Sequence, residues 1–143
     1  MAYLQIKDFN KTFNDGFKVL CDINFELEKG QILSIIGHSG SGKTTLLRMI
    51  SGLDTDFTGN IIGGGVGNVS VAFQEYRLFP QLTAIENVIY ANSDTKDEAV
   101  IEKAKKMLFS LGLSDEDFDL LPHQLSGGMK QRVSLARALL YDA

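Results

Sequence analysis

Three glycines fall within residues 37–42, between an apolar run and a helical pattern. The run, Ile32 to Ile36, has the length of a buried strand, and apolar residues recur at helical spacing from Leu46 until Gly52. Together they predict a strand, a glycine-rich loop and a helix in direct succession. This order restricts the chain to folds in which a helix begins where a buried strand ends.

The loop matches the phosphate-binding pattern G-x-x-x-x-G-K-[ST], with the sequence Gly37-His38-Ser39-Gly40-Ser41-Gly42-Lys43-Thr44. Its glycines let backbone N–H groups point inward as an anion nest, at the positive end of the helix dipole. We therefore expect residues 37–45, Thr45 included, to bind ATP. Lys43 would reach the β- and γ-phosphates as a catalytic charge, and the Thr44 hydroxyl would bind Mg²⁺. His38 is expected to contribute through its backbone N–H; the alternative for the whole loop is a turn with a solvated lysine.

A second helix is predicted to begin at Ser126, followed by Gly127 and Gly128. A serine N-cap and two glycines leave N–H donors and a hydroxyl available, with no acidic side chain in the first turn to occupy them. The segment therefore predicts a second anion site. An ordinary N-capped helix would explain Ser126 but not the glycines, which cost roughly 1 kcal/mol each inside a helix.

These two motifs resemble those of the ATP-binding subunits of ABC transporters. Leu125 to Arg132 reads LSGGMKQR, close to the family's L-S-G-G-Q signature, with Met129 where glutamine is usual. The resemblance implies that Ser126, Gly127 and Gly128 close over the γ-phosphate held by another subunit. The implied unit is a head-to-tail homodimer or heterodimer with two ATP molecules.

The segment between the motifs resembles the family's Q-loop, with Gln74 after Val71-Ala72-Phe73. By that resemblance Gln74 is a catalytic residue that contacts Mg²⁺ and the attacking water. Phe13 falls where the family places an aromatic ring that stacks on adenine, and core packing is the alternative for it.

The resemblance implies an α/β fold: a P-loop NTPase core with an N-terminal antiparallel β subdomain and a helical subdomain, the C-terminal half of the core being absent. One truncated domain is expected, divided approximately into residues 1–30 (β ribbon), 31–74 (P-loop core), 75–125 (helical subdomain) and 126–143 (signature helix). Period-two alternation supports strands at Tyr3–Phe9 and Val19–Leu27, around an Asn14-Asp15-Gly16 turn. A second hairpin is expected from residues 60–62 and 70–73, around the glycine cluster 63–67.

The helical part carries two capping-box patterns, Thr83 with Glu86 and Thr95 with Glu98. An apolar stripe that ends at Gly112 is expected to be core; its members are Val100, Ile101, Ala104, Met107, Leu108 and Leu111.

The family's later motifs, a strand ending in aspartate and glutamate and then a switch histidine, are not found in this sequence. Since those carboxylates bind Mg²⁺ and polarise water, the expectation is ATP binding with little turnover. The function implied is an ATPase that powers a membrane transporter, with a faint likeness to importers of nitrate, sulfonate or taurine. The alternatives are an inactive regulatory fragment and a non-transport ABC ATPase.

Composition limits the partners. With 14 basic and 18 acidic residues and no long basic run, nucleic acid is an unsuitable partner. The sequence has no run of 18 apolar residues, so we expect the chain to act on a transporter from the cytoplasmic side of the membrane. The partners implied by the resemblance are permease subunits and, indirectly, a solute-binding protein. The single cysteine, Cys21, excludes an internal disulfide, fits a reducing cytosol and is expected to be a small buried hydrophobe.

Overall fold

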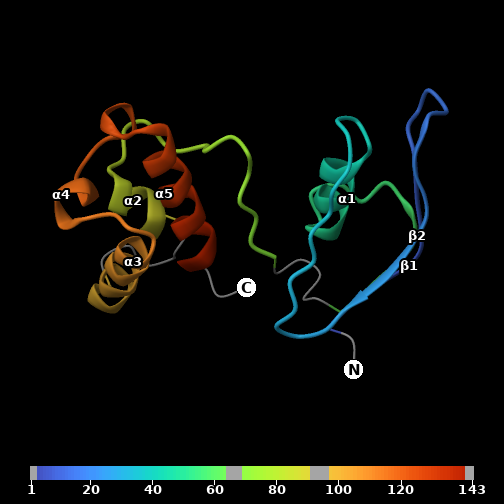
Figure 1. Ribbon diagram of the computed structural model, residues 1–143, viewed down its shortest axis with the longest axis horizontal. Coiled ribbons are helices and arrows are strands. Elements are labelled where there is room, and N and C mark those ends of the chain that lie inside the picture. The colour runs from blue at the N-terminus through green and yellow to red at the C-terminus, as the bar shows by residue number, and fades with distance from the viewer. Residues whose placement is uncertain (1–2, 64–68, 91–96, 141–143) are drawn as a thin grey trace. The chain divides into compact units, whose positions relative to one another are not determined.

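The computed structural model describes residues 3–63, 69–90 and 97–140. The chain divides into two compact units, Met1–Val69 and Ser70–Ala143, and each is described by itself (Figure 1). Residues 64–67 of the expected glycine turn, and Thr95 of the second capping box, lie outside the described residues. Within the described part of the chain, no helix has the length and apolar character needed to cross a membrane.

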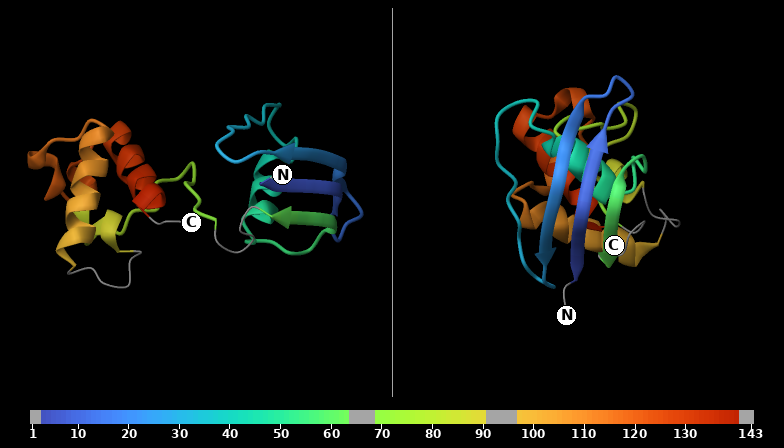
Figure 2. Two further views of the ribbon diagram at one scale, coloured as in Figure 1. Left: turned by 90° about the horizontal axis from the view of Figure 1, so that it is seen from below. Right: turned by 90° about the vertical axis from the view of Figure 1, so that its right-hand side faces the viewer.

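The first unit is an antiparallel sheet with one helix on its face (Figure 2). Its strands are β1 (Leu4–Thr12), β2 (Lys18–Leu27) and β3 (Thr58–Gly63), in the order β2-β1-β3. The helix is α1 (Lys43–Ile50), and the core between it and the sheet consists of Leu4, Ile6, Phe9, Leu20, Leu46 and Met49. The predicted ribbon, its turn and the helix are thereby confirmed.

Bulges interrupt the pairing of β1 with β2 and overturn the expectation for Cys21, which is exposed. Phe9 pairs with Ile23 and Lys11 pairs with Leu20, so two residues of β2 oppose one residue of β1. Asp22 in this bulge has a left-handed φ of 49°. Because a bulge breaks the alternation of sides, Cys21 and Asp22 both face outward, which a period-two reading could not foresee.

Two other predicted strands are absent from the described residues. Ile32–Ile36 forms no strand, since the sheet consists only of β1, β2 and β3, and Ile32 and Ile36 are 94% and 91% exposed. Residues 60–62 lie in β3 but pair with β1, whereas residues 70–73 form no strand; Ser70 instead donates a hydrogen bond to the Ala138 carbonyl.

The second unit is helical. It contains α2 (Ala84–Ile89), α3 (Glu98–Ser110), α4 (Asp115–Phe118), the 3₁₀ turn η1 (Pro122–Gln124) and α5 (Gly127–Leu140). Both halves of the Thr83–Glu86 capping box are formed, and the N-cap of α3 is Asp97, whose carboxylate accepts the Ala99 N–H. The predicted stripe is core: Ala104 and Leu108 are buried, and its other members pack against them.

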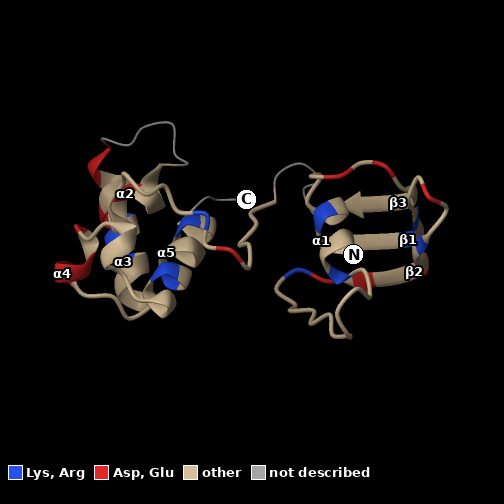
Figure 3. Cartoon of the chain, turned by 90° about the horizontal axis from the view of Figure 1, so that it is seen from above, with Lys and Arg blue, Asp and Glu red and all other residues tan. Residues whose placement is uncertain are grey.

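Acidic side chains gather at the short helix α4 (Figure 3). Asp115, Glu116 and Asp117 occupy its first turn, where carboxylates complement the unpaired N–H groups. The Ser114 N–H and hydroxyl donate to the Asp117 carboxylate, which lowers the pKa of that group. This cap fixes the turn between α3 and the segment that leads to α5.

Candidate functional site

The glycine-rich loop takes a conformation that its sequence requires. Gly40 and Gly42 have φ values of 81° and 88°, in the left-handed region that other residues rarely adopt. Gly42 has a second constraint, because a Cβ atom there would lie 2.9 Å from a Leu20 methyl group and 3.1 Å from the Val19 carbonyl oxygen. The loop is therefore pressed against β2, and only a glycine fits at its last turn.

Lys43 folds back over this loop. Its ammonium donates to the Gly37 carbonyl at 2.8 Å, to the His38 carbonyl at 2.7 Å and to the Ser41 hydroxyl at 3.3 Å. These acceptors are neutral and the loop is exposed, so an anion in the nest would compete for the same three donors of the ammonium. The ammonium is thus held on the carbonyl groups of the glycine-rich loop.

The start of α1 is free of competing groups. Its N-cap is Gly42, which has no side chain to bind the first N–H groups, and no acidic residue lies in the first turn. Thr44 is exposed and Thr45 half-buried, so the Thr44 hydroxyl is accessible for a cation beside bound phosphates. The His38 ring nitrogen Nδ1 lies 2.8 Å from the Ser39 carbonyl, and the His38 carbonyl rather than its imidazole contacts Lys43.

Phe13 belongs to the same unit as this loop. Its N–H donates to the Phe17 carbonyl at 2.9 Å, which closes the hairpin between β1 and β2. Two residues beyond Phe17, Val19 contacts the position of Gly42. The Phe13 ring is 42% exposed, which disfavours the alternative that it is a core residue.

Sequence reasoning missed Lys11, which is only 4% exposed in the first unit. Its ammonium lies 2.9 Å from an Asp56 carboxylate oxygen, 3.6 Å from Asp54, and 5.6 Å from the centre of the Phe13 ring. The hydrogen bond with Asp56 raises the pKa of Lys11, and the Asp56 N–H lowers the pKa of Asp54. The sequence offered one signal for this contact: Lys11 occupies a core-facing position of β1, and a buried ammonium requires a charged or hydrogen-bonding partner.

The second predicted anion site lies at the start of α5. The Ser126 hydroxyl accepts the Met129 N–H at 3.2 Å, which confirms the N-cap, and the first turn holds no acidic residue. A Cβ atom on Gly127 would lie 3.3 Å from the Tyr76 hydroxyl, but one on Gly128 would meet nothing within 4 Å. Packing within the described residues therefore gives no reason for glycine at position 128.

Gln74 is exposed and lies in the same unit as Ser126, whereas the phosphate loop lies in the other unit. The segment after Gln74 is anchored by Arg137 of α5. Its guanidinium donates to the Arg77 carbonyl at 2.9 Å and to the Tyr76 carbonyl at 3.1 Å, and burial lowers its pKa. Arg137 thus connects α5 to the loop that follows Gln74.

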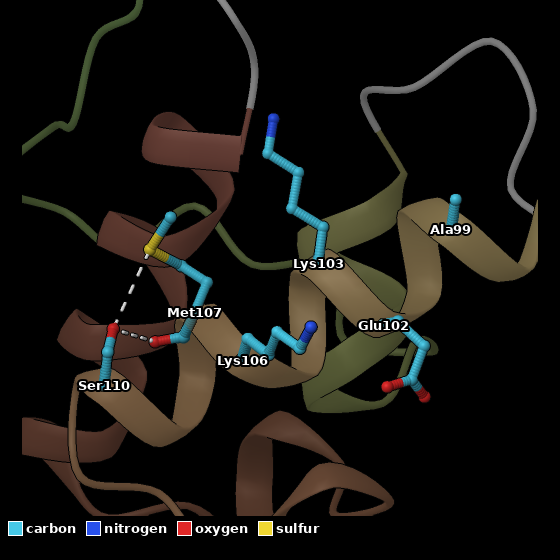
Figure 4. A pocket seen from close by; sticks show the side chains of 6 residues that line it. All are labelled: Ala99, Glu102, Lys103, Lys106, Met107 and Ser110. Carbon is cyan, nitrogen blue, oxygen red and sulfur yellow. Dashed lines mark hydrogen bonds between the residues drawn. The ribbon is translucent and has the colours of Figure 1, made fainter.

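A hollow of about 490 Å³ lies along α3 (Figure 4). Its lining residues are Ala99, Glu102, Lys103, Lys106, Met107 and Ser110. All six come from α3, and none is a predicted site residue, so this hollow is a shallow depression between surface side chains of one helix.

The chain is similar to proteins of one known family. A family model described as ABC transporter matches residues 20–143. Among curated relatives, the sulfate/thiosulfate import ATP-binding protein CysA of Pseudomonas aeruginosa is 38% identical and covers 97% of this chain and 46% of its own length. The aliphatic sulfonates import ATP-binding protein SsuB of Bacillus cereus is 46% identical, over 87% of this chain and 51% of SsuB. The spermidine/putrescine import ATP-binding protein PotA of Fusobacterium nucleatum is 43% identical, over 96% of this chain and 39% of PotA.

Solved structures share the fold. The dimeric structure of MJ0796, a bacterial ABC transporter cassette, has a TM-score of 0.84 and 30% identity, over 97% of this chain and 70% of that one. Another structure of that cassette, bound to ADP and Pi, has a TM-score of 0.83 and 31% identity. The chain spans about half the length of the curated relatives it matches.

Proposed function

The chain belongs to the ABC transporter family, and from that premise we propose that it is the ATP-binding part of an ATPase subunit that powers a membrane importer. The observation that carries the proposal is the phosphate loop, in which Gly40 and Gly42 take left-handed conformations and the Lys43 ammonium lies on the loop's carbonyl groups. The three relatives described above are each named as an import ATP-binding protein, which supports transport over the other roles of ABC ATPases.

ATP would bind with its phosphates over residues 37–45. Lys43 would exchange two carbonyl acceptors for β- and γ-phosphate oxygens, a favourable exchange because charged acceptors form stronger hydrogen bonds with an ammonium. Mg²⁺ would be bound by the Thr44 hydroxyl and the phosphates, and would neutralise charge on the triphosphate. Phe13 would offer its exposed ring to the adenine base.

Ser126, Gly127 and Gly128 would contact the γ-phosphate held by another subunit. The support is that no described residue lies within 4 Å of a Cβ atom on Gly128, together with a first turn of α5 that holds no acidic side chain. A backbone without Cβ allows close approach of an anion from outside the chain. A head-to-tail dimer with two ATP molecules follows, and the related MJ0796 cassette is dimeric in its solved structure.

Hydrolysis would need more than these residues supply. Gln74 would orient water and contact Mg²⁺, but the sequence contains no strand ending in aspartate and glutamate after the signature. Positioning and charge stabilisation account for most phosphoryl-transfer catalysis, so the 143 residues alone would bind ATP with little turnover.

The partners would be permease subunits, with a solute-binding protein acting indirectly, at the cytoplasmic face of the membrane. The sequence likeness favours sulfonate-type anions, and one relative is named for aliphatic sulfonates. A relative of similar identity is named for spermidine and putrescine, which are cations. We therefore propose that the chain serves an importer, and we assign no particular solute to it.

The test is calorimetric titration of the purified chain with ATP, with and without Mg²⁺. Lys43→Ala should weaken binding by about 10- to 100-fold, because a charged hydrogen bond contributes roughly 1.5–3 kcal/mol. Lys29→Ala, at an exposed lysine of the same unit, is the matched control and should leave binding unchanged. Equal affinity of the Lys43 variant and the unsubstituted chain would refute the proposal.

A further inference from the structure

Lys11 holds a charge at the edge of the core, next to an exposed ring. Its side chain is 4% exposed, while the Phe13 ring is 42% exposed, and the ammonium lies over that ring at 5.6 Å from its centre. A cation within about 6 Å of an aromatic face is attracted by the ring's quadrupole. The ring is thus bound on one face by a group that the proposed function does not use.

The ammonium itself is fixed by the loop after α1. It contacts the carboxylates of Asp54 and Asp56 and donates to the Asp56 carbonyl. The Asp54 N–H in turn donates to the Arg48 carbonyl in the last turn of α1. Lys11 is therefore tied to the far end of the helix that begins at the phosphate loop.

The backbone of Lys11 reaches the other end of the same helix. Its partner in the β1–β2 ladder is Leu20, whose side chain packs against Gly42. Phe13 follows two residues later and is held by its hydrogen bond to Phe17. Lys11 is thus linked to the phosphate loop through Leu20 and contacts the Phe13 ring directly.

We propose that Lys11 is a positioning residue for nucleotide binding, which holds the Phe13 ring with one face on its ammonium and the opposite face available to a purine base. The inference rests on the proposed function. A ring fixed before binding loses less conformational entropy when a base stacks on it, so Lys11 raises affinity for the base of ATP. It has no such effect on a ligand that offers phosphates alone.

The experiment compares ATP with inorganic tripolyphosphate, each titrated with Mg²⁺ into the full chain. Lys11→Met should weaken ATP binding by about two- to tenfold, in line with the strength of cation–π contacts, and leave tripolyphosphate within about twofold. Lys11→Arg keeps the charge and should retain ATP affinity. In a Phe13→Ala background, Lys11→Met should cause no further loss for ATP, since the two residues act as a unit.

The outcomes separate the two proposals. If Lys11→Met weakens both ligands equally, or if its effect on ATP persists without the Phe13 ring, Lys11 only supports the fold and the inference is overturned. Thermal unfolding of each variant identifies such a loss of fold, and the Lys11→Arg and Phe13→Ala variants then still test the coupling. If the unsubstituted chain binds neither ligand, the proposed function fails and takes the inference with it.

Discussion

The side-chain oxygen of Asn10 accepts the backbone N–H of Asp22 at 2.8 Å, across the β1–β2 ladder. The reverse contact is also present, since Asn24 accepts the Asp8 N–H at 2.8 Å. Asp8 and Asp22 are the bulge residues of β1 and β2, and both have a φ of 49°. Each of them donates its N–H to an asparagine on the other strand. This reciprocal pair fixes the twist of the ribbon that supports Phe13 and the phosphate loop.

Replacing Asn24 should loosen this ribbon. Asn24→Ala removes a hydrogen bond to Asp8 and two to Asp22, and should lower the free energy of unfolding by about 1–2 kcal/mol. Lys7→Gln, at an exposed position of β1, is the control and should have little effect. Urea unfolding followed by circular dichroism gives both values, and equal stability of the two variants would show that the asparagine contacts are not needed.

Two glycines of the phosphate loop should differ in their response to alanine. Both have a left-handed φ, but only at Gly42 would a Cβ atom collide with β2. Gly40→Ala should cost about 1 kcal/mol of stability from backbone strain, and Gly42→Ala about 2–4 kcal/mol because overpacking adds to it. Thermal unfolding measures the difference, and an equal cost at both positions would contradict the close packing described for Gly42.

A tryptophan at position 13 would report on base stacking directly. The chain contains no tryptophan, so fluorescence of the Phe13→Trp variant would arise from that ring alone. ATP with Mg²⁺ should change its emission, whereas tripolyphosphate should not, because only ATP carries a base. Phe17→Trp, on the same hairpin and 59% exposed, is the matched control. An equal response of the two variants to ATP would remove Phe13 from the site.

Gly128 should be dispensable for folding and required for assembly. Gly128→Ala places a methyl group where nothing lies within 4 Å, and alanine favours a helix by up to about 1 kcal/mol, so the variant should be as stable as the unsubstituted chain or more so. ATP-dependent dimerisation, measured by sedimentation, should be lost because the methyl group blocks the approach of the other subunit's phosphate. Dimerisation that survives the substitution would exclude the start of α5 from the interface.

The α4 cap predicts a loss of stability in acid. Hydrogen bonds from Ser114 lower the pKa of Asp117 in the folded chain, so folding favours the ionised carboxylate. This stabilisation is complete above the usual carboxyl pKa and declines as pH falls through the lowered value. Asp117→Asn should remove that component of the pH dependence of unfolding, and Ser114→Ala should reduce it. An unchanged acid profile in Asp117→Asn would show that the cap does not stabilise the fold.

Local patterns predicted the elements whose partners are near in sequence. The hairpin around Asn14, the capping box at Thr83 and the start of α5 at Ser126 each depend on contacts within a few residues or between adjacent strands. The phosphate loop was predictable for the same reason, since its conformation follows from glycine positions. Position 74 had no such local signal, and its role remains a prediction drawn from family resemblance.

Long-range contacts accounted for the failures. Ile32–Ile36 has the composition of a strand, but a strand exists only where a neighbour completes its hydrogen bonds, and none of the described residues does so. The Cys21 side chain faces outward because a bulge interrupts the pairing of β2 with β1, and the residues that pair there are about ten positions or more apart in the sequence.

The sequence by itself determined the conformation of the loop for which we propose phosphate binding, because glycine spacing, a lysine and a helix start act through local backbone geometry. Only the tertiary structure decided that the Lys11 charge lies over the Phe13 ring and that Gly42 must pack against β2. Lys11 and Phe13 are near neighbours in the sequence, but the Asp56 that fixes the Lys11 ammonium lies 45 positions later, and the Leu20 that packs against Gly42 lies 22 positions earlier than Gly42. The energies of such contacts depend on distance in space, which no pattern along a single chain records.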